Sequence, residues 1–159
     1  VFWYALFGLP GLLACKAINT LDSMIGHRTP RHRAFGRWTA HADTAMNFFP
    51  ARFAGLFLVL AAAFVARTRV RVGPALKVML RDAGKHKSVN AGWPEGAMAG
   101  ALNLALAGPR RYREQTVIDP WIGDGTAQAT SADIRRGLRL YVAACFVTAA
   151  FVGALAMSR

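Results

Sequence analysis

The sequence contains few acidic residues and few cysteines. It has 8 Asp and Glu against 20 Lys and Arg, which gives a formal net charge of +12, and it has only two cysteines. Cys15 and Cys145 both lie in apolar segments far apart in the chain, so we interpret them as small buried hydrophobic side chains. The cysteines therefore give no indication of the redox compartment.

The motifs of common nucleotide and metal sites are also absent. No G-x-x-x-x-G-K-[ST] segment occurs, and Gly123-Asp-Gly125 lacks the third glycine of a dinucleotide fingerprint. There is no H-E-x-x-H and no C-x-x-C. His27, His32 and His41 are irregularly spaced among arginines, which oppose cation binding. These absences argue against a P-loop, a dinucleotide-binding fold and a standard zinc site.

Apolar residues, in contrast, are abundant and are gathered in blocks. Hydrophobic residues make up 54% of the chain, and its mean hydropathy of +0.27 is high for a water-soluble domain. Basic residues flank the apolar blocks instead of mixing with them, which is typical of a membrane protein in contact with lipid. This separation argues against nucleic acid as the partner of the basic residues, although such a net charge alone would fit it.

Three apolar blocks are candidates for membrane helices. Residues 140–157 form an 18-residue block, about 27 Å long as a helix and close to the hydrocarbon thickness of roughly 30 Å. Residues 1–15 form another. Residues 53–66 are only 14 residues long; they either span with help from Met46, Phe48 and Phe49, or form a buried or re-entrant helix. We therefore predict an all-α, multi-pass integral membrane helix bundle with polar loops, in the cell (inner) membrane.

Local signals refine this prediction. Thr130 followed by Asp133 predicts a capped helix start ahead of the last block. Gly96 and Gly100 have the spacing that lets two helix backbones approach closely, although small residues at this spacing also occur as ordinary packing. The basic excess in residues 67–139 predicts that this loop faces the cytoplasm. Val1 opens inside an apolar run without a charged n-region, so the start is not an intact signal peptide.

Three compact polar motifs flank the apolar blocks, and each has a structural alternative. NTLDSMIGHR (residues 19–28) places Asn19 and Asp22 on one helical face, or is a helix end that meets lipid head groups. SVNAGWPE (residues 88–95) is either a site or an ordinary helix entry. DPWIGDG (residues 119–125) is either a turn or a site for magnesium phosphate or an amine. Because polar groups at a membrane boundary are costly, they suggest function.

These three motifs, in this order, resemble the CobD/CbiB family of multi-pass membrane proteins of cobalamin biosynthesis, known as adenosylcobinamide-phosphate synthase. The resemblance runs from about residue 7 to residue 125, and the terminal apolar helix fits it as well. Members of the family extend well N-terminal of Val1. The chain, residues 1–159, therefore corresponds to a single membrane domain that we expect to be the C-terminal half of a longer protein, without any site residues that lie upstream.

The resemblance implies a carbon–nitrogen ligase. ATP would be consumed to join aminopropanol, or its phosphate, to a carboxylate of the corrinoid adenosylcobyric acid, with magnesium as the accompanying ion. Other corrinoid enzymes are implied as partners. The matching positions suggest three sets of roles: catalysis by Asp22 and Glu95, with Glu95 taking the amine proton; substrate binding by Asn19, His27, Arg28, Lys85, Asn90, Trp93 and Trp121; and magnesium binding by Asp119 and Asp124.

Two expectations remain open at this point. The three motifs are expected to border one polar cavity, unless residues 53–66 cross the membrane and leave the first motif apart from the other two. The alternative to an enzyme is a non-catalytic membrane scaffold or carrier for corrinoid intermediates. Carriers bind substrate near the bilayer midplane, whereas these motifs flank the apolar blocks, which favours an enzyme.

Overall fold

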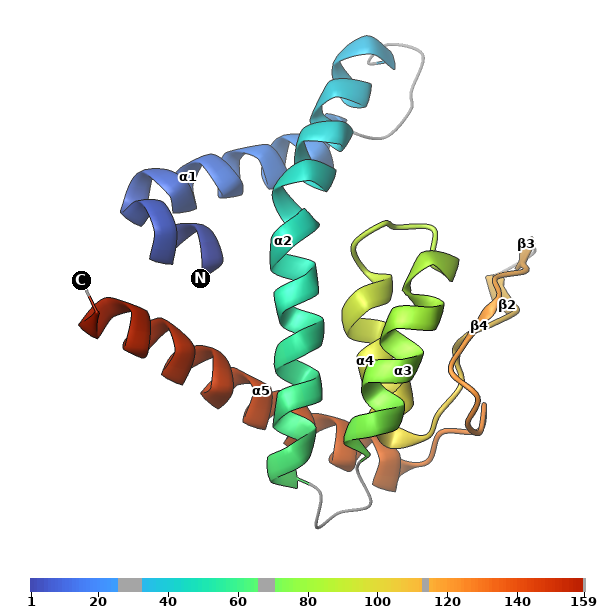
Figure 1. The fold of residues 1–159 in the computed structure, drawn as a ribbon. Helices are drawn as coiled ribbons and strands as arrows, with labels where there is room; N and C mark the ends of the chain where they lie inside the picture. The colour runs from blue at the N-terminus through green and yellow to red at the C-terminus, as the bar shows by residue number, and fades with distance from the viewer. Residues whose placement is uncertain (26–32, 66–70, 113–114, 159) are drawn as a thin grey trace. The chain divides into compact units, whose positions relative to one another are not determined.

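The computed structural model describes residues 1–25, 33–65, 71–112 and 115–158 (Figure 1). The chain divides into two compact units, Val1–Pro50 and Ala51–Arg159.

The first unit contains α1 (Phe2–Ile25) and the beginning of α2 (Arg33–Val65). Gly8, at φ 64° and ψ −151°, interrupts the helical backbone of α1 just before Pro10. The Trp3 indole N–H donates to the Met46 carbonyl oxygen at 3.1 Å, which ties α1 to α2. The helix α1 continues well beyond the first apolar block and includes most of the first polar motif.

Three helices are long and apolar enough to cross a membrane within the described residues: Phe2–Ile25, Gly36–Val65 and Ser131–Met157. The predicted all-α membrane helix bundle is therefore confirmed. The 14-residue estimate for residues 53–66 was too short, because α2 accommodates Pro50 within the helix and already contains Met46, Phe48 and Phe49. The resulting 30-residue candidate span is about 45 Å long at 1.5 Å per residue.

The helix α5 (Ser131–Met157) begins as predicted. The Thr130 hydroxyl accepts from the Asp133 backbone N–H, and the Asp133 carboxylate accepts from the Thr130 N–H, which is a capping box. Large side chains of this helix, such as Phe146 at 72% exposure, face outward as lipid-contacting residues do. Cys15 is half-buried and Cys145 is exposed. The prediction that both cysteines are buried was wrong, because an apolar residue of a membrane helix can face lipid instead of protein.

The core of the second unit is built from the end of α2, α3 (Val72–Asp82), α4 (Gly92–Leu102) and α5. Figure 1 shows α3 and α4 side by side. A Cβ on Gly96 would lie 3.0 Å from the Met79 Cα, and one on Gly100 would lie 2.3 Å from the Pro74 carbonyl oxygen. The predicted close approach of two helix backbones is therefore confirmed.

A short 3-10 turn, η3 (Ala83–Lys85), follows α3, and four short strands follow α4. They are β1 (Leu106–Ala107), β2 (Arg110–Tyr112), β3 (Gln115–Val117) and β4 (Trp121–Ile122). β1 pairs antiparallel with β4, and β2 pairs antiparallel with β3. No pattern in the sequence predicts these strands, because two or three residues are too few to show an alternation of apolar and polar side chains.

The glycine contact between α3 and α4 gives a direct test. Replacing Gly100 with alanine would place a Cβ against the Pro74 backbone, so we expect the free energy of unfolding to fall by about 1–3 kcal/mol. Gly84→Ala is the matched control, because nothing lies within 4 Å of a Cβ at Gly84. Thermal unfolding in detergent measures both variants. Equal stability of the two would contradict the close packing.

Candidate functional site

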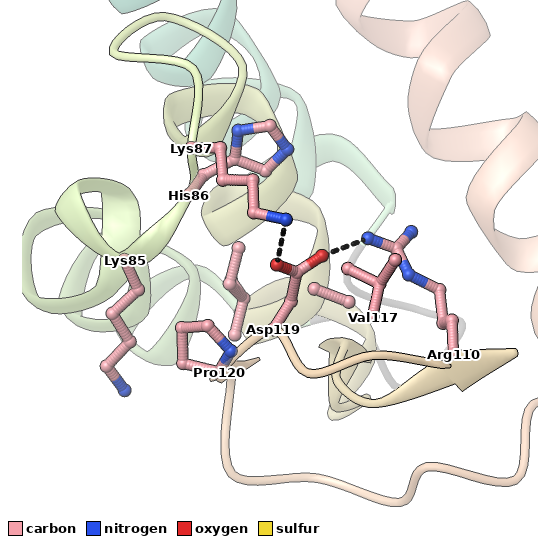
Figure 2. A pocket seen from close by; sticks show the side chains of 9 residues that line it. Lys85, His86, Lys87, Arg110, Val117, Asp119 and Pro120 are labelled. Atoms are coloured by element: carbon pink, nitrogen blue, oxygen red, sulfur yellow. Dashed lines mark hydrogen bonds and ion pairs between the residues drawn. The ribbon is translucent and has the colours of Figure 1, made fainter. Parts of the chain in front are cut away.

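A cavity of about 280 Å³ lies beside η3 and the strands of the second unit (Figure 2). Its apolar wall includes Val117, Pro120 and Ile122, while several charged side chains come from the loop after α3 and from β2. The full lining is Lys85, His86, Lys87, Ala107, Arg110, Val117, Asp119, Pro120 and Ile122. Residues of the third motif thus line a small, predominantly cationic cavity together with Lys85, His86 and Lys87, which directly precede the second motif.

Asp119 is the carboxylate that lines this cavity. Its Oδ1 lies 2.9 Å from the Lys87 Nζ, and its Oδ2 accepts a hydrogen bond from the Arg110 guanidinium at 2.8 Å. The two cations reach it from different sides in Figure 2. Lys87, followed by Arg110, holds the pKa of the Asp119 carboxyl below its usual range. The side chain is only 11% exposed, so its negative charge is fixed at the cavity.

A second carboxylate, Asp82, is fully buried at the end of α3. Arg81 donates two hydrogen bonds to it at 2.7 Å, and Lys85 Nζ lies 2.8 Å from its Oδ1. The Gly123 N–H also donates to it at 2.9 Å. These contacts, with the Arg81 hydrogen bonds the largest cause, hold the Asp82 pKa far below its usual range. Asp82 thereby connects α3, the cavity lysine and the third motif.

The third motif contains β4 and the tight bend that follows it. Gly123 has φ +92°, and a Cβ there would lie 2.3 Å from the Leu104 carbonyl oxygen. A Cβ on Gly125 would lie 1.9 Å from the Asn103 carbonyl oxygen. Asp124 accepts two hydrogen bonds from Arg81, at 2.7 and 2.8 Å. The Trp121 carbonyl oxygen accepts from Lys85 at 3.4 Å. The chain therefore bends sharply at residues 123–125, while Asp119, Pro120 and Ile122 of the same motif line the cavity. Whether the motif is a turn alone or a site stays open.

The second motif forms the entry to α4. Pro94 and Glu95 lie in its first turn, as the helix-entry interpretation predicts. The Asn90 Oδ1 accepts from Arg52 at 3.4 Å, and the same guanidinium lies 4.6 Å from the Trp93 ring centroid. Asn90 and Trp93 therefore join α4 to α2. Their role in substrate binding stays a prediction.

Glu95 approaches the cavity through His86. The Glu95 Oε2 lies 3.5 Å from the His86 Nε2, and both side chains are about one-quarter exposed. The Ser88 backbone N–H donates to the His86 Nδ1 at 2.8 Å. In the neutral ring, Nε2 therefore carries the hydrogen and faces Glu95. This places a predicted catalytic carboxylate next to a residue that lines the cavity.

The first motif lies in the other unit. Asn19 donates to Asp43 at 3.3 Å, and Asn47 donates to the same carboxylate oxygen at 3.0 Å. Asp22 is half-buried near the end of α1. The predicted binding residues His27 and Arg28 lie outside the described residues. A cavity shared by all three motifs stays a prediction, as do the roles of Asn19 and Asp22.

The predicted magnesium ligands have other partners in this structure. Asp119 contacts Lys87 and Arg110, and Asp124 contacts Arg81. The part of the chain that the structure describes contains no group of three or more His, Cys, Asp or Glu that could hold a metal ion. As arranged here, the two carboxylates do not fit a shared magnesium site. Magnesium binding by these residues stays a prediction.

Sequence reasoning missed Asp82, His86 and Arg110. The buried residues of α3 are Ala75, Val78, Met79 and Asp82, which follow helical spacing, so a carboxylate on the apolar face was a readable signal. Arg110 reaches the cavity only because β2 and β3 fold the polar loop back, and no local pattern indicated that pairing.

Comparison with known proteins places the chain in a family. The family model described as CobD/Cbib protein matches residues 1–141. The chain belongs to the CobD/Cbib family. A relative from Sinorhizobium sp, named cobalamin biosynthesis protein CobD, is 51% identical over 98% of this chain and 48% of its own length. A relative of the same name from Rhodobacter capsulatus is 50% identical over 89% of this chain and 43% of its own length.

The chain thus spans about half the length of the curated relatives it matches. The expectation that it corresponds to the C-terminal half of a longer protein stays a prediction. No solved structure matches the chain. The cavity described above lies within the matched residues.

Proposed function

We propose that this CobD/Cbib chain forms part of a cobalamin-biosynthesis enzyme of the cell (inner) membrane. In the proposed reaction, ATP-dependent amide ligation joins aminopropanol, or its phosphate, to adenosylcobyric acid and gives adenosylcobinamide or its phosphate. The relatives' names support the pathway. The cationic cavity supports the chemistry, because phosphate oxygens occur at every stage of such a ligation.

The proposed ligation proceeds in two chemical steps, activation of the carboxylate and attack by the amine. The terminal phosphoryl group of ATP moves to a carboxylate oxygen of the corrinoid, which gives an acyl phosphate and ADP. The amine nitrogen then attacks the acyl carbon, the carbon–nitrogen bond forms, and the carbon–oxygen bond to phosphate breaks. Inorganic phosphate leaves and the nitrogen loses a proton. A site for this chemistry needs cations for phosphate and a base for the proton.

The cavity offers the cations, and a carboxylate next to one of its lining residues offers the base. Lys87 and Arg110 present their charges at the cavity, and Lys85 also lines it. Glu95, beside His86, is the proposed acceptor of the amine proton. ATP is the proposed phosphoryl donor, and we assign no step to magnesium because the carboxylates described here give it no shared site.

The proposal rests on the positive charge of the cavity, and a substitution of Arg110 tests it. In the full-length protein, Arg110→Gln is expected to raise the KM for the phosphate-bearing substrate about tenfold or more, since a charge-assisted hydrogen bond to phosphate is lost. Arg111→Gln is the matched control, because its exposed side chain neighbours Arg110 on β2 but does not line the cavity. Steady-state kinetics of corrinoid amide formation measures both variants.

Two results would count against the proposal. An equal KM change in both arginine variants would show that the cavity has no special role. Purified full-length protein that binds the corrinoid but forms no amide with ATP and the amine present would instead support the scaffold or carrier alternative.

A further inference from the structure

We propose that Asp119 acts as a tethered competitor in the anion site: its carboxylate occupies Lys87 and Arg110 until an anionic ligand displaces it. The inference deepens the proposed function, on which it rests only in taking the cavity to bind an anionic group of the substrate. It identifies the ligand group as a phosphate dianion and gives Asp119 a role other than binding metal.

The geometry of Asp119 matches that of a bound anion. Both of its oxygens contact cations, at 2.9 and 2.8 Å, within the cavity lining. Its own side chain is 11% exposed, whereas the side chains of Lys87 and Arg110 are 72% and 44% exposed. The carboxylate is thus held inside, while both cations extend to solvent and can turn toward a ligand. Figure 2 shows Asp119 between them.

An anionic ligand binds only if its interactions with Lys87 and Arg110 are stronger than those of the Asp119 carboxylate that it displaces. A carboxylate ligand would replace the interactions of Asp119 with equivalent ones, so the exchange gains little. A phosphate monoester carries a charge of about −1.5 to −2 and three acceptor oxygens, so it can engage a lysine and a guanidinium together and still accept further hydrogen bonds. The tethered carboxylate lowers the affinity for every anion by the same factor. Phosphate therefore stays bound, whereas single carboxylates fall below useful affinity.

A purely structural role for Asp119 predicts the opposite effect of a substitution. If the carboxylate only ordered Lys87 and Arg110, its removal would leave the cations disordered and weaken anion binding. If it competes, its removal takes away the anion that contacts both cations, and anion binding strengthens. The sign of the change separates the two roles.

The test is a titration of the detergent-purified full-length protein with inorganic phosphate, and separately with acetate, followed by NMR line broadening of each anion. Asp119→Asn is expected to tighten phosphate binding about tenfold and acetate binding by a similar factor, the scale of one charge-assisted interaction. Asp124→Asn is the matched control, because this carboxylate belongs to the same motif but is 70% exposed and pairs with Arg81 outside the lining. Weaker or unchanged phosphate binding in Asp119→Asn overturns the proposal.

A second measurement keeps the proposal testable if Asp119→Asn does not fold. In wild-type protein labelled at the aspartate carboxyl carbon, the Asp119 resonance, assigned through Asp119→Glu, is expected to shift at saturating phosphate. A resonance that stays in place overturns the proposal. If phosphate binding tightens in Asp119→Asn but the wild type forms no amide, the proposed function fails and the competitor role stands. If the wild type forms the amide but phosphate binding does not tighten in Asp119→Asn, the proposed function stands and the competitor role fails.

Discussion

Asp82→Asn is expected to lower the free energy of unfolding by about 3 kcal/mol, near the lower end of the range for breaking a buried charge pair. Asp82 is fully buried, and its partners Arg81 and Lys85 are 39% and 41% exposed, which moderates the loss. Asparagine can still accept from the Gly123 N–H, but it removes the charge that both cations share. Thermal unfolding of the full-length protein in detergent measures the effect.

The acid limb of the stability profile gives an independent check. Because the folded-state pKa of Asp82 lies below its ordinary value of 3.8, its contribution is fully present above that value and is lost as the pH falls below it. When the pH is lowered from 5 to below 3.8, the free energy of unfolding should therefore fall less in the Asp82→Asn variant than in the wild type. Asp124→Asn, whose partner contact is largely exposed, should change stability much less than Asp82→Asn does. A larger loss for Asp124→Asn than for Asp82→Asn would contradict the central role of Asp82.

Local signals in the sequence predicted several elements correctly. The Thr130–Asp133 pair predicted the start of α5, since a capping box depends on neighbours three residues apart. Gly96 and Gly100 predicted the approach of α4 to another helix, because glycines four residues apart lie on the same helix face and leave room for a second backbone. Pro94 and Glu95 predicted the first turn of α4. In each case the interaction is encoded within one turn of helix.

The rest of the site depends on contacts between residues far apart in the chain. Asp82 meets Gly123 across 41 residues, and Arg110 meets Asp119 only through the pairing of two three-residue strands. The polar partners of Asp119 and Asp124 are also distant in sequence, with the exception of Arg110. This explains why two carboxylates in one motif suggested a metal site, whereas the fold pairs Asp119 with Lys87 and Arg110, and Asp124 with Arg81.

Glu95→Gln is expected to lower kcat for amide formation by about 100-fold or more, the scale of general-base catalysis. The carboxylate lies at the entry of α4 and faces His86, a cavity residue. Gln keeps the shape of the side chain and loses the proton acceptor. Glu95 does not itself line the cavity, so the KM for the phosphate-bearing substrate should stay unchanged. Steady-state assays of the full-length protein, with chromatographic detection of the corrinoid product, separate kcat from KM.

His86→Gln distinguishes a direct role of Glu95 from one that acts through the imidazole. If Glu95 only orients His86, each single variant and the double variant should have the same kcat, because both remove one unit of function. If Glu95 accepts the proton itself, His86→Gln should retain more activity than Glu95→Gln.

Asp22→Asn extends the same assay to the first motif: a comparable loss of kcat with normal membrane insertion would support one site served by both units. Parental kcat in Glu95→Gln would contradict the general-base role, and parental kcat in Asp22→Asn would limit the site to the second and third motifs.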